Sequence, residues 1–227
     1  MTDYYLSRLE REEARAYMKI YTATAAFEDR VAVPFGRKKS LELLKAVRLD
    51  HPEIFWLKGV SASGDAQGTA IFPEYSFKRK AVQPIESTIE RTAERIIHPA
   101  LGSDDRKKVA FVHDFILRNV VYTSAYRNFS HEIYGVLCNH IGVCEGIAKT
   151  VKYLLDMLQV DCLCVECLPD ERNTAHSWNI VFVEGRPLHY DMTFDLTGKD
   201  RFRYFGLTDA QIFEDHRPPI TEVPRCE

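Results

Sequence analysis

The residues from 142 to 193 most constrain the fold of this chain, because one helical pattern and three strand patterns follow one another there with short connections. Apolar residues first recur at a helical interval and predict a helix with one buried face. These residues are Ile147, Val151, Leu154, Leu155 and Leu158. Three β-rich runs with strand-like alternation follow, at residues 160–168, 175–183 and 188–193. This part of the chain therefore combines a helix with neighbouring strands.

The last two runs are predicted to form a hairpin, since the residues between them are typical of a turn. His176 and Asp191 then lie on its two arms. With Glu184 and Gly185 as the turn, the two side chains share a face of the sheet as diagonal neighbours about 7–8 Å apart. An odd-numbered loop without a bulge would place them on opposite faces. An even loop permits a hydrogen bond between the imidazole and the carboxylate.

Cys144 lies where the predicted helix begins, between Gly142 and Gly146. The unpaired N–H groups and the dipole at a helix N-terminus favour a thiolate over a thiol. The same N–H groups can donate to the oxyanion that forms when a carbonyl is attacked. A single cysteine at a helix start is more often a small buried residue, so the functional interpretation depends on its partners.

Cys144, His176 and Asp191 together supply a nucleophile, a base and a group that orients the base. Each also has an ordinary structural interpretation. His176 could be a strand histidine with satisfied hydrogen bonds, and Asp191 could be a turn or salt-bridge residue. Their combination in this chain order favours thiol-dependent catalysis.

Three motifs resemble the transglutaminase-like superfamily: Gly-x-Cys-x-Gly at 142–146, His-Ser-Trp-Asn at 176–179 and Tyr-Asp-Met-Thr-Phe-Asp at 190–195. The resemblance runs from about Val109 to Asp195. It implies an α+β, papain-like core in which a helix carrying the nucleophile packs on an antiparallel sheet. Cys144, His176 and Asp191 match the catalytic positions of the family.

The resemblance implies acyl transfer or hydrolysis at a peptide or amide carbonyl through a Cys144 thioester, with a peptide or protein as substrate and no cofactor. Aspartate-rich calcium loops are not recognisable, so hydrolysis by a cysteine peptidase or amidase is favoured over calcium-dependent crosslinking. Glu145 departs from the pattern, because a carboxylate close to the sulfur would oppose thiolate formation. The alternative is a catalytically silent module that binds a peptide or protein partner.

Other residues are candidates for the same region. Three side chains are expected to line the substrate site: Tyr134, Asn139 and Trp178. His140 is a rival base, ranked below His176 because no carboxylate partner is evident.

The cysteines that follow the predicted helix could in principle bind zinc. Cys162, Cys164 and Cys167 could do so with Cys138, but strand alternation turns Cys167 away from the other two, so buried thiols are expected and no metal is assigned.

The first hundred residues are expected to form a mainly helical region packed on a core at 101–227. Helices are predicted at 3–27, from Ser40 to before Pro52, at 85–97 and at 103–121, with a strand at 71–77. Residues 59–68 are predicted to be an exposed loop or hairpin tip. His113 lies off the apolar face of its helix and is expected at the surface. The tail from Phe213 is expected to be irregular and to pack across the core.

The formal net charge of −3 offers no field that would recruit nucleic acid or an anionic membrane. No window approaches the ~20 apolar residues of a membrane span, and the first residues lack an apolar stretch of signal-peptide length. We therefore expect a cytoplasmic protein whose six cysteines are thiols. The oligomeric state is open.

Overall fold

The computed structural model describes residues 3–123, 129–169 and 174–227. Contacts divide the chain into two compact units, residues 2–86 and residues 87–227. The division falls within helix α4 (Arg79–Ile97), which belongs in part to each unit. The boundary predicted after residue 100 lies in the second unit. Residues 170–173, most of the turn predicted between the first two strand patterns of the core, lie outside the described residues.

The first unit combines helices with a three-stranded antiparallel sheet of order β1-β3-β2. Its helices are α1 (Tyr4–Ser7), α2 (Arg11–Ala25) and α3 (Arg37–Asp50), and its strands are β1 (Val31–Val33), β2 (Leu57–Gly64) and β3 (Thr69–Tyr75). The sheet is larger than the single strand predicted there. The hairpin tip is confined to residues 65–68, because residues 57–64 pair with β3.

One continuous helix over residues 3–27 is a wrong prediction. The chain breaks between α1 and α2, where Glu10 and Glu13 form a capping box that starts the second helix. Asp50 joins these helices to the end of α3. Its Oδ2 accepts hydrogen bonds from the Tyr17 hydroxyl at 2.9 Å and from the backbone N–H of Leu6 at 3.1 Å.

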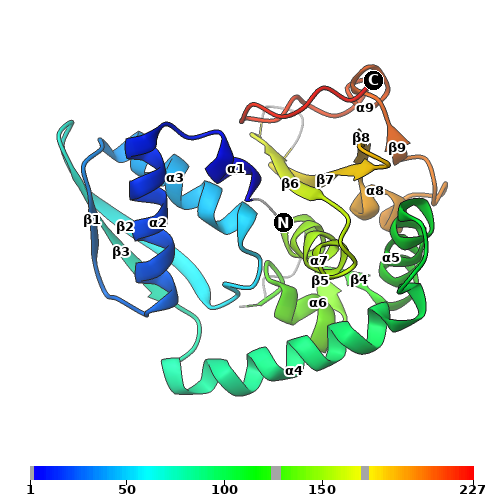
Figure 1. Ribbon diagram of the computed structural model, residues 1–227, viewed down its shortest axis with the longest axis horizontal. Coiled ribbons are helices and arrows are strands. Elements are labelled where there is room, and N and C mark those ends of the chain that lie inside the picture. The colour runs from blue at the N-terminus through cyan, green and yellow to red at the C-terminus, as the bar shows by residue number, and fades with distance from the viewer. Residues whose placement is uncertain (1–2, 124–128, 170–173) are drawn as a thin grey trace. The chain divides into compact units, whose positions relative to one another are not determined.

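The second unit contains the four-stranded antiparallel sheet β6-β7-β8-β9, shown with its helices in Figure 1. These strands are β6 (Cys162–Cys167), β7 (His176–Val183), β8 (Arg186–Tyr190) and β9 (Phe205–Leu207), and the parallel pair β4 (Val121–Tyr122) and β5 (Ile141–Gly142) lies apart from them. Besides its part of α4, the helices are η1 (His98–Ala100), α5 (Asp105–Asn119), α6 (Ile133–Asn139), α7 (Cys144–Met157), α8 (Met192–Thr197) and α9 (Asp209–Ile212).

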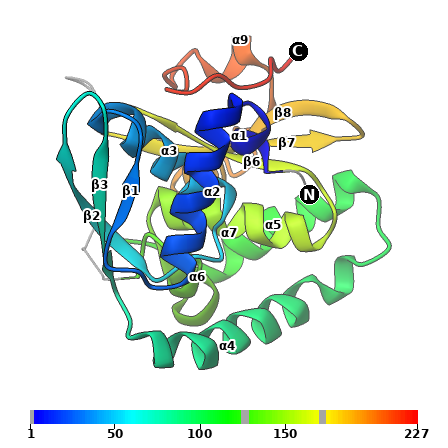
Figure 2. The ribbon, with the colours of Figure 1, turned by 60° about the vertical axis from the view of Figure 1, so that its left-hand side comes forward.

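Helix α7 forms the core of this unit, because it packs on β6 and β7 and also contacts α5 and α6. All five residues of its predicted apolar stripe are at most 2% exposed. Figure 2 shows α7 between the sheet and the neighbouring helices from a second direction. A helix packed on an antiparallel sheet confirms the expected α+β fold class.

The hairpin of β7 and β8 has the register predicted from the sequence. Val183 pairs with Arg186 across the two-residue turn. Glu184 and Gly185 both have positive φ, 54° and 79°, as the tight turn of a twisted hairpin requires. The even loop directs His176 and Asp191 to the same face of the sheet.

The prediction that His113 lies at the surface is wrong. His113 is 1% exposed, and its Nε2 lies 2.9 Å from Oδ2 of Asp195. Helix α5 packs against both α7 and α8, so its buried face is wider than the stripe of four apolar residues indicated. That stripe, Val109, Val112, Ile116 and Val120, is buried as predicted.

The chain after α9 is irregular and bonds to strands of the main sheet. The N–H of Ile220 donates to the carbonyl of Glu166 at 2.9 Å, and Nε of Arg186 donates to the carbonyl of Glu227 at 2.5 Å. The first bond holds the tail against β6, and the second holds residue 227 against the start of β8. Within the described part of the chain, no helix has both the length and the apolar character needed to cross a bilayer.

Replacing Gly146 with alanine should destabilise the second unit. An added Cβ would lie 2.3 Å from the carbonyl oxygen of Ser130, a backbone atom that moves only with its loop. Overpacking of this kind costs about 1–3 kcal/mol. Thermal or urea unfolding should therefore show lower stability for Gly146→Ala.

Gly59→Ala is the matched control, since its nearest new neighbour would be 3.8 Å away. It should leave the midpoint of unfolding almost unchanged. Equal stability of the two variants would contradict the close contact at Gly146.

Candidate active site

Cys144 is the first residue of α7 and is partly exposed. The residue before it, Val143, occupies the N-cap and has no side-chain oxygen, so it makes no capping hydrogen bond to the first turn. Strand β5 leads directly into this position, and its Gly142 pairs with Tyr122 of β4. The parallel pair therefore brings Tyr122 close to the N-terminus of α7, whose first turn has no side-chain cap.

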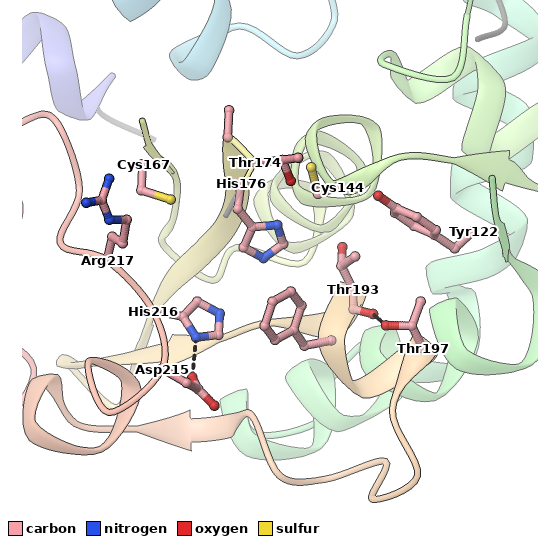
Figure 3. A pocket seen from close by; sticks show the side chains of 12 residues that line it. Tyr122, Cys144, Cys167, Thr174, His176, Thr193, Thr197, Asp215, His216 and Arg217 are labelled. Carbon is pink, nitrogen blue, oxygen red and sulfur yellow. Dashed lines mark hydrogen bonds and ion pairs between the residues drawn. The ribbon is translucent and has the colours of Figure 1, made fainter. Parts of the chain in front are cut away.

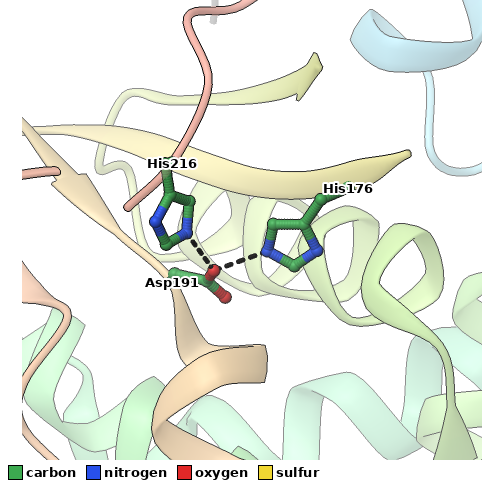
Figure 4. A group of neighbouring side chains, drawn as sticks. All are labelled: His176, Asp191 and His216. Atoms are coloured by element: carbon green, nitrogen blue, oxygen red, sulfur yellow. Dashed lines mark hydrogen bonds and ion pairs between the residues drawn. The ribbon is translucent and has the colours of Figure 1, made fainter. Parts of the chain in front are cut away.

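His176 begins β7, and Asp191 follows β8 as the N-cap of α8. Nε2 of His176 lies 2.6 Å from Oδ2 of Asp191. The other oxygen of Asp191 accepts the backbone N–H groups of Thr193 at 2.9 Å and Phe194 at 3.0 Å. Asp191 is fully buried, so these bonds fix its carboxylate and, through it, the ring of His176 (Figure 4).

Hydrogen bonds set the charge states of this pair. Burial alone would raise the pKa of Asp191, but hydrogen bonds from His176 and His216 hold this pKa at about 2. Burial alone would lower the pKa of His176, but its hydrogen bonds to Asp191 and to Cys144 raise this pKa to about 10. Since Nε2 is engaged by Asp191, Nδ1 is the nitrogen left for the sulfur of Cys144.

A buried lysine bridges Glu145 and Glu132. Nζ of Lys149, whose side chain is 2% exposed, lies 2.8 Å from Oε1 of Glu145 and 2.9 Å from Oε2 of Glu132. The second oxygen of Glu145 lies 3.0 Å from Nδ1 of His131. These bonds engage the Glu145 carboxylate in an ion-pair network. Its negative charge therefore opposes a thiolate at Cys144 less than the sequence alone suggested.

A cavity of about 550 Å³ opens beside Cys144 and His176 (Figure 3). It is lined by Tyr122, Cys144, Cys167, Thr174, Ala175, His176, Thr193, Phe194, Thr197, Asp215, His216 and Arg217. Figure 3 shows the phenol oxygen of Tyr122 directed toward Cys144. Burial raises the pKa of Tyr122, and negative charge on Cys144 and Asp191 raises it further, so the phenol keeps its proton.

The three residues predicted to bind substrate are not among the described residues that line this cavity. Trp178 is 1% exposed, and its ring stacks beside His176 with the centroids 5.9 Å apart. Tyr134 and Asn139 belong to α6, and neither is among the described residues that line the cavity. Their role in binding stays a prediction. His140 ends α6 with a left-handed φ of 57° and borders a different hollow beside α4 and α5.

Cys162 and Cys164 are buried strand thiols that share a face, since Nδ2 of Asn179 approaches their sulfurs at 3.5 Å and 3.7 Å. Burial raises the pKa of Cys162, and it raises the pKa of Cys164 to about 12. Both therefore keep their protons at neutral pH. Cys167 instead reaches the cavity, in agreement with the predicted alternation of this strand.

Asp215 and His216 are site residues that sequence reasoning missed. They lie in the tail, and His216 contacts Asp191 directly, with its Nε2 2.8 Å from Oδ2 of Asp191. Neither residue belongs to a periodic pattern. The one signal in the sequence was an Asp-His pair within a segment predicted to be irregular. The fold of the tail back over the sheet decides their position.

Among the residues that the structure describes, two groups have side chains close enough to hold a metal ion: His176 with Asp191 and His216, and His189 with Asp209 and Cys226. In the first group the carboxylate oxygen already accepts from both histidines. In the second, Nδ1 of His189 accepts the Trp178 N–H at 3.0 Å, so Nε2 carries the ring proton and donates to Asp209. We assign no metal to either group, because binding would displace these bonds.

No family model matches the sequence, and no curated protein matches it. Among solved structures the chain is similar to a crystal structure of a TGase, with a TM-score of 0.44 and 14% identity over 75% of this chain and 52% of that one. It is also similar to a candidate cysteine protease from Cytophaga hutchinsonii, with a TM-score of 0.39 and 12% identity over 58% of this chain and 55% of that one. A candidate protease from Parabacteroides distasonis has a TM-score of 0.35 and 11% identity, over 58% of this chain and 35% of that one. The chain spans about half the length of the first two of these structures.

The stability that His176 contributes should be lost at high pH. Its folded-state pKa of about 10 lies above the value of about 6.5 in an unfolded chain. The contribution is therefore complete below pH 6.5 and is lost as the pH rises through 10. Denaturant unfolding should show that the stability difference between the protein and its His176→Gln variant shrinks over this range.

The stability that Asp191 contributes should be lost at low pH instead, since its folded-state pKa of about 2 lies below the unfolded value of about 3.9. The difference between the protein and Asp191→Asn should shrink as the pH falls from 4 to 2. Differences that are constant with pH would contradict the assigned charge states.

Proposed function

We propose that this protein is a thiol-dependent enzyme that cleaves a peptide or other amide bond through a thioester on Cys144. One observation carries the proposal: Cys144 and His176 line the same cavity, and the ring of His176 is hydrogen-bonded to the buried Asp191. A nucleophile, a base and a group that holds the base in one tautomer are the parts that covalent acyl transfer requires.

In the first half of the reaction, the Cys144 sulfur forms a bond to the substrate carbonyl carbon, and the carbonyl oxygen becomes an oxyanion. Nδ1 of His176 holds the proton taken from the thiol and gives it to the departing amine as the C–N bond breaks. Asp191 keeps Nε2 protonated throughout, because its buried carboxylate accepts that N–H.

In the second half, Nδ1 of His176 takes a proton from water, and the water oxygen bonds to the thioester carbon. The C–S bond then breaks, the acid product leaves, and the sulfur returns to its starting state. We favour water over an amine as the acyl acceptor, because the sequence has no recognisable aspartate-rich calcium loops of the large crosslinking enzymes.

The oxyanion would be stabilised from two directions. The backbone N–H groups of the first turn of α7 are free of any side-chain cap from Val143. The Tyr122 hydroxyl faces the sulfur across the cavity and can donate a second hydrogen bond (Figure 3). Both donors are in place before the substrate arrives, since a strand pair and a helix hold them.

The cavity supports a peptide or protein as the substrate. Its wall combines the rings of Tyr122 and Phe194 with small polar side chains, such as those of Thr174 and Thr193. Such a surface can hold an uncharged side chain next to a backbone amide.

Alkylation by iodoacetamide at pH 6 to 7 tests the proposal. Cys144 should react at least about ten times faster than the other cysteines, because it begins helix α7 and shares its cavity with the ring of His176. Mapping of the modified residues by mass spectrometry measures these rates. His176→Ala should remove the advantage of Cys144, and Cys144→Ala should abolish cleavage of peptide and amide substrates.

Cys138 provides the internal control, since it is also partly exposed and burial raises its pKa. Labelling of Cys144 at the rate of Cys138 would contradict the proposal and would favour a catalytically silent module that binds a peptide.

Tyr122→Phe should lower the turnover number about 10²-fold, which is the usual loss when one oxyanion donor is removed. The rate of alkylation of Cys144 should stay the same, because alkylation forms no oxyanion. Comparison of hydrolysis and alkylation in the two proteins measures both effects. An equal loss in both reactions would show that the phenol acts on the thiol instead.

A further inference from the structure

His216 is a second histidine on the carboxylate that orients His176. It lies one residue beyond Asp215 in the tail, and its side chain is 1% exposed. Its two ring nitrogens face two different carboxylates: Nε2 lies 2.8 Å from Oδ2 of Asp191, and Nδ1 lies 2.7 Å from Oδ1 of Asp215. Figure 4 shows both histidines on the same oxygen of Asp191.

Neither carboxylate has room for a proton of its own. Oδ1 of Asp191 accepts two backbone N–H groups, and its Oδ2 faces both histidines. Oδ2 of Asp215 accepts from the Tyr204 hydroxyl at 2.7 Å and from Nη2 of Arg203 at 3.2 Å. An ionised carboxylate only accepts hydrogen bonds, so both nitrogens of His216 must be donors.

We propose that His216 is a positioning residue: an imidazolium that bridges Asp191 and Asp215, shares the charge of Asp191 with His176, and thereby limits how strongly His176 holds its second proton. The inference rests on the proposed function, because it assigns His216 a role in tuning the base of that reaction.

The neighbours of His216 are consistent with a cation at this position. Strand β7 contributes His176, whose ring centroid is 5.5 Å away, and β8 contributes His189, which is 0% exposed. Asp191 belongs to the N-cap of α8, directly after β8. The remaining neighbours are Tyr204, Asp215 with its partner Arg203, the adjacent Arg217, and the uncharged rings of Trp178 and Phe194. Asp191 and Asp215 are the acidic groups in direct contact with His216, one at each nitrogen.

A cation close to Cys144 and His176 changes the protonation of His176 in a direction that electrostatics fixes. It disfavours the second proton on His176, since the two rings would then both be positive. His176 therefore passes its proton to a leaving amine more readily than it would beside an unshared Asp191. His216 does not touch the reacting atoms and acts only through Asp191 and the field at His176.

The protonation of His216 can be measured directly in the unmodified protein. Nitrogen-15 chemical shifts of its ring at pH 7 should show that both nitrogens carry protons. In Asp215→Asn the second anionic partner is lost, and one of these protons should be lost at a lower pH than in the unmodified protein. A single protonated nitrogen in the unmodified protein at pH 7 would overturn the proposal.

His216→Gln tests the effect on His176, because the amide N–H of glutamine can still donate to Asp191 without a positive charge. The pH midpoint of the His176 ring, followed by NMR, should rise by about 1 unit. If His216 were only a structural support, its loss would loosen the bond between Asp191 and His176 and lower the midpoint. An unchanged or lowered midpoint would therefore overturn the proposal.

Tyr204→Phe is the matched control, since it removes one hydrogen bond to Asp215 but leaves every charge in place. It should not move the His176 midpoint. Alkylation of Cys144 in the same samples separates the two hypotheses. Slow labelling in the unmodified protein refutes the proposed function, whereas fast labelling with no rise of the midpoint in His216→Gln refutes only the role of His216.

Discussion

The site depends on one buried carboxylate. Asp191 is fully excluded from water and is stabilised by two backbone N–H groups at the start of α8 and by two histidines. A buried charge is costly unless its oxygens are bonded, so the end of β8, the start of α8 and the tail must all be in place together. Asp191 thus links the stability of the second unit to the orientation of His176.

Cys144, the proposed nucleophile, is positioned by a separate part of the same unit. Helix α7 begins at Cys144, one residue after the end of β5. Its buried apolar stripe packs on the sheet that carries His176. Gly142 and Gly146 allow neighbouring segments to pass close to this turn, with Ser130 and Val136 as their nearest contacts. The first turn of the helix is therefore held on two sides while the sulfur stays partly exposed.

Opposite charges lie next to one another around Cys144 and His176. Lys149 bridges Glu145 and Glu132 near Cys144, and His216 is proposed to share the charge of Asp191 near His176. Each cation is buried and bonded to more than one oxygen, which holds it at one distance from the site. Such fixed charges act without rearrangement during a reaction, which is the physical basis of electrostatic preorganisation.

The sequence by itself determined the local features: the stripe of α7, the position of Cys144 at its start, and the even hairpin loop that directs His176 and Asp191 to one face. Each follows from spacing along the chain, because helix and strand periods convert spacing directly into direction. Only the tertiary structure decided which segments meet. The burial of His113, the approach of Tyr122 through the β4-β5 pair, and the return of His216 to Asp191 all join residues far apart in the sequence, and no local period encodes such contacts.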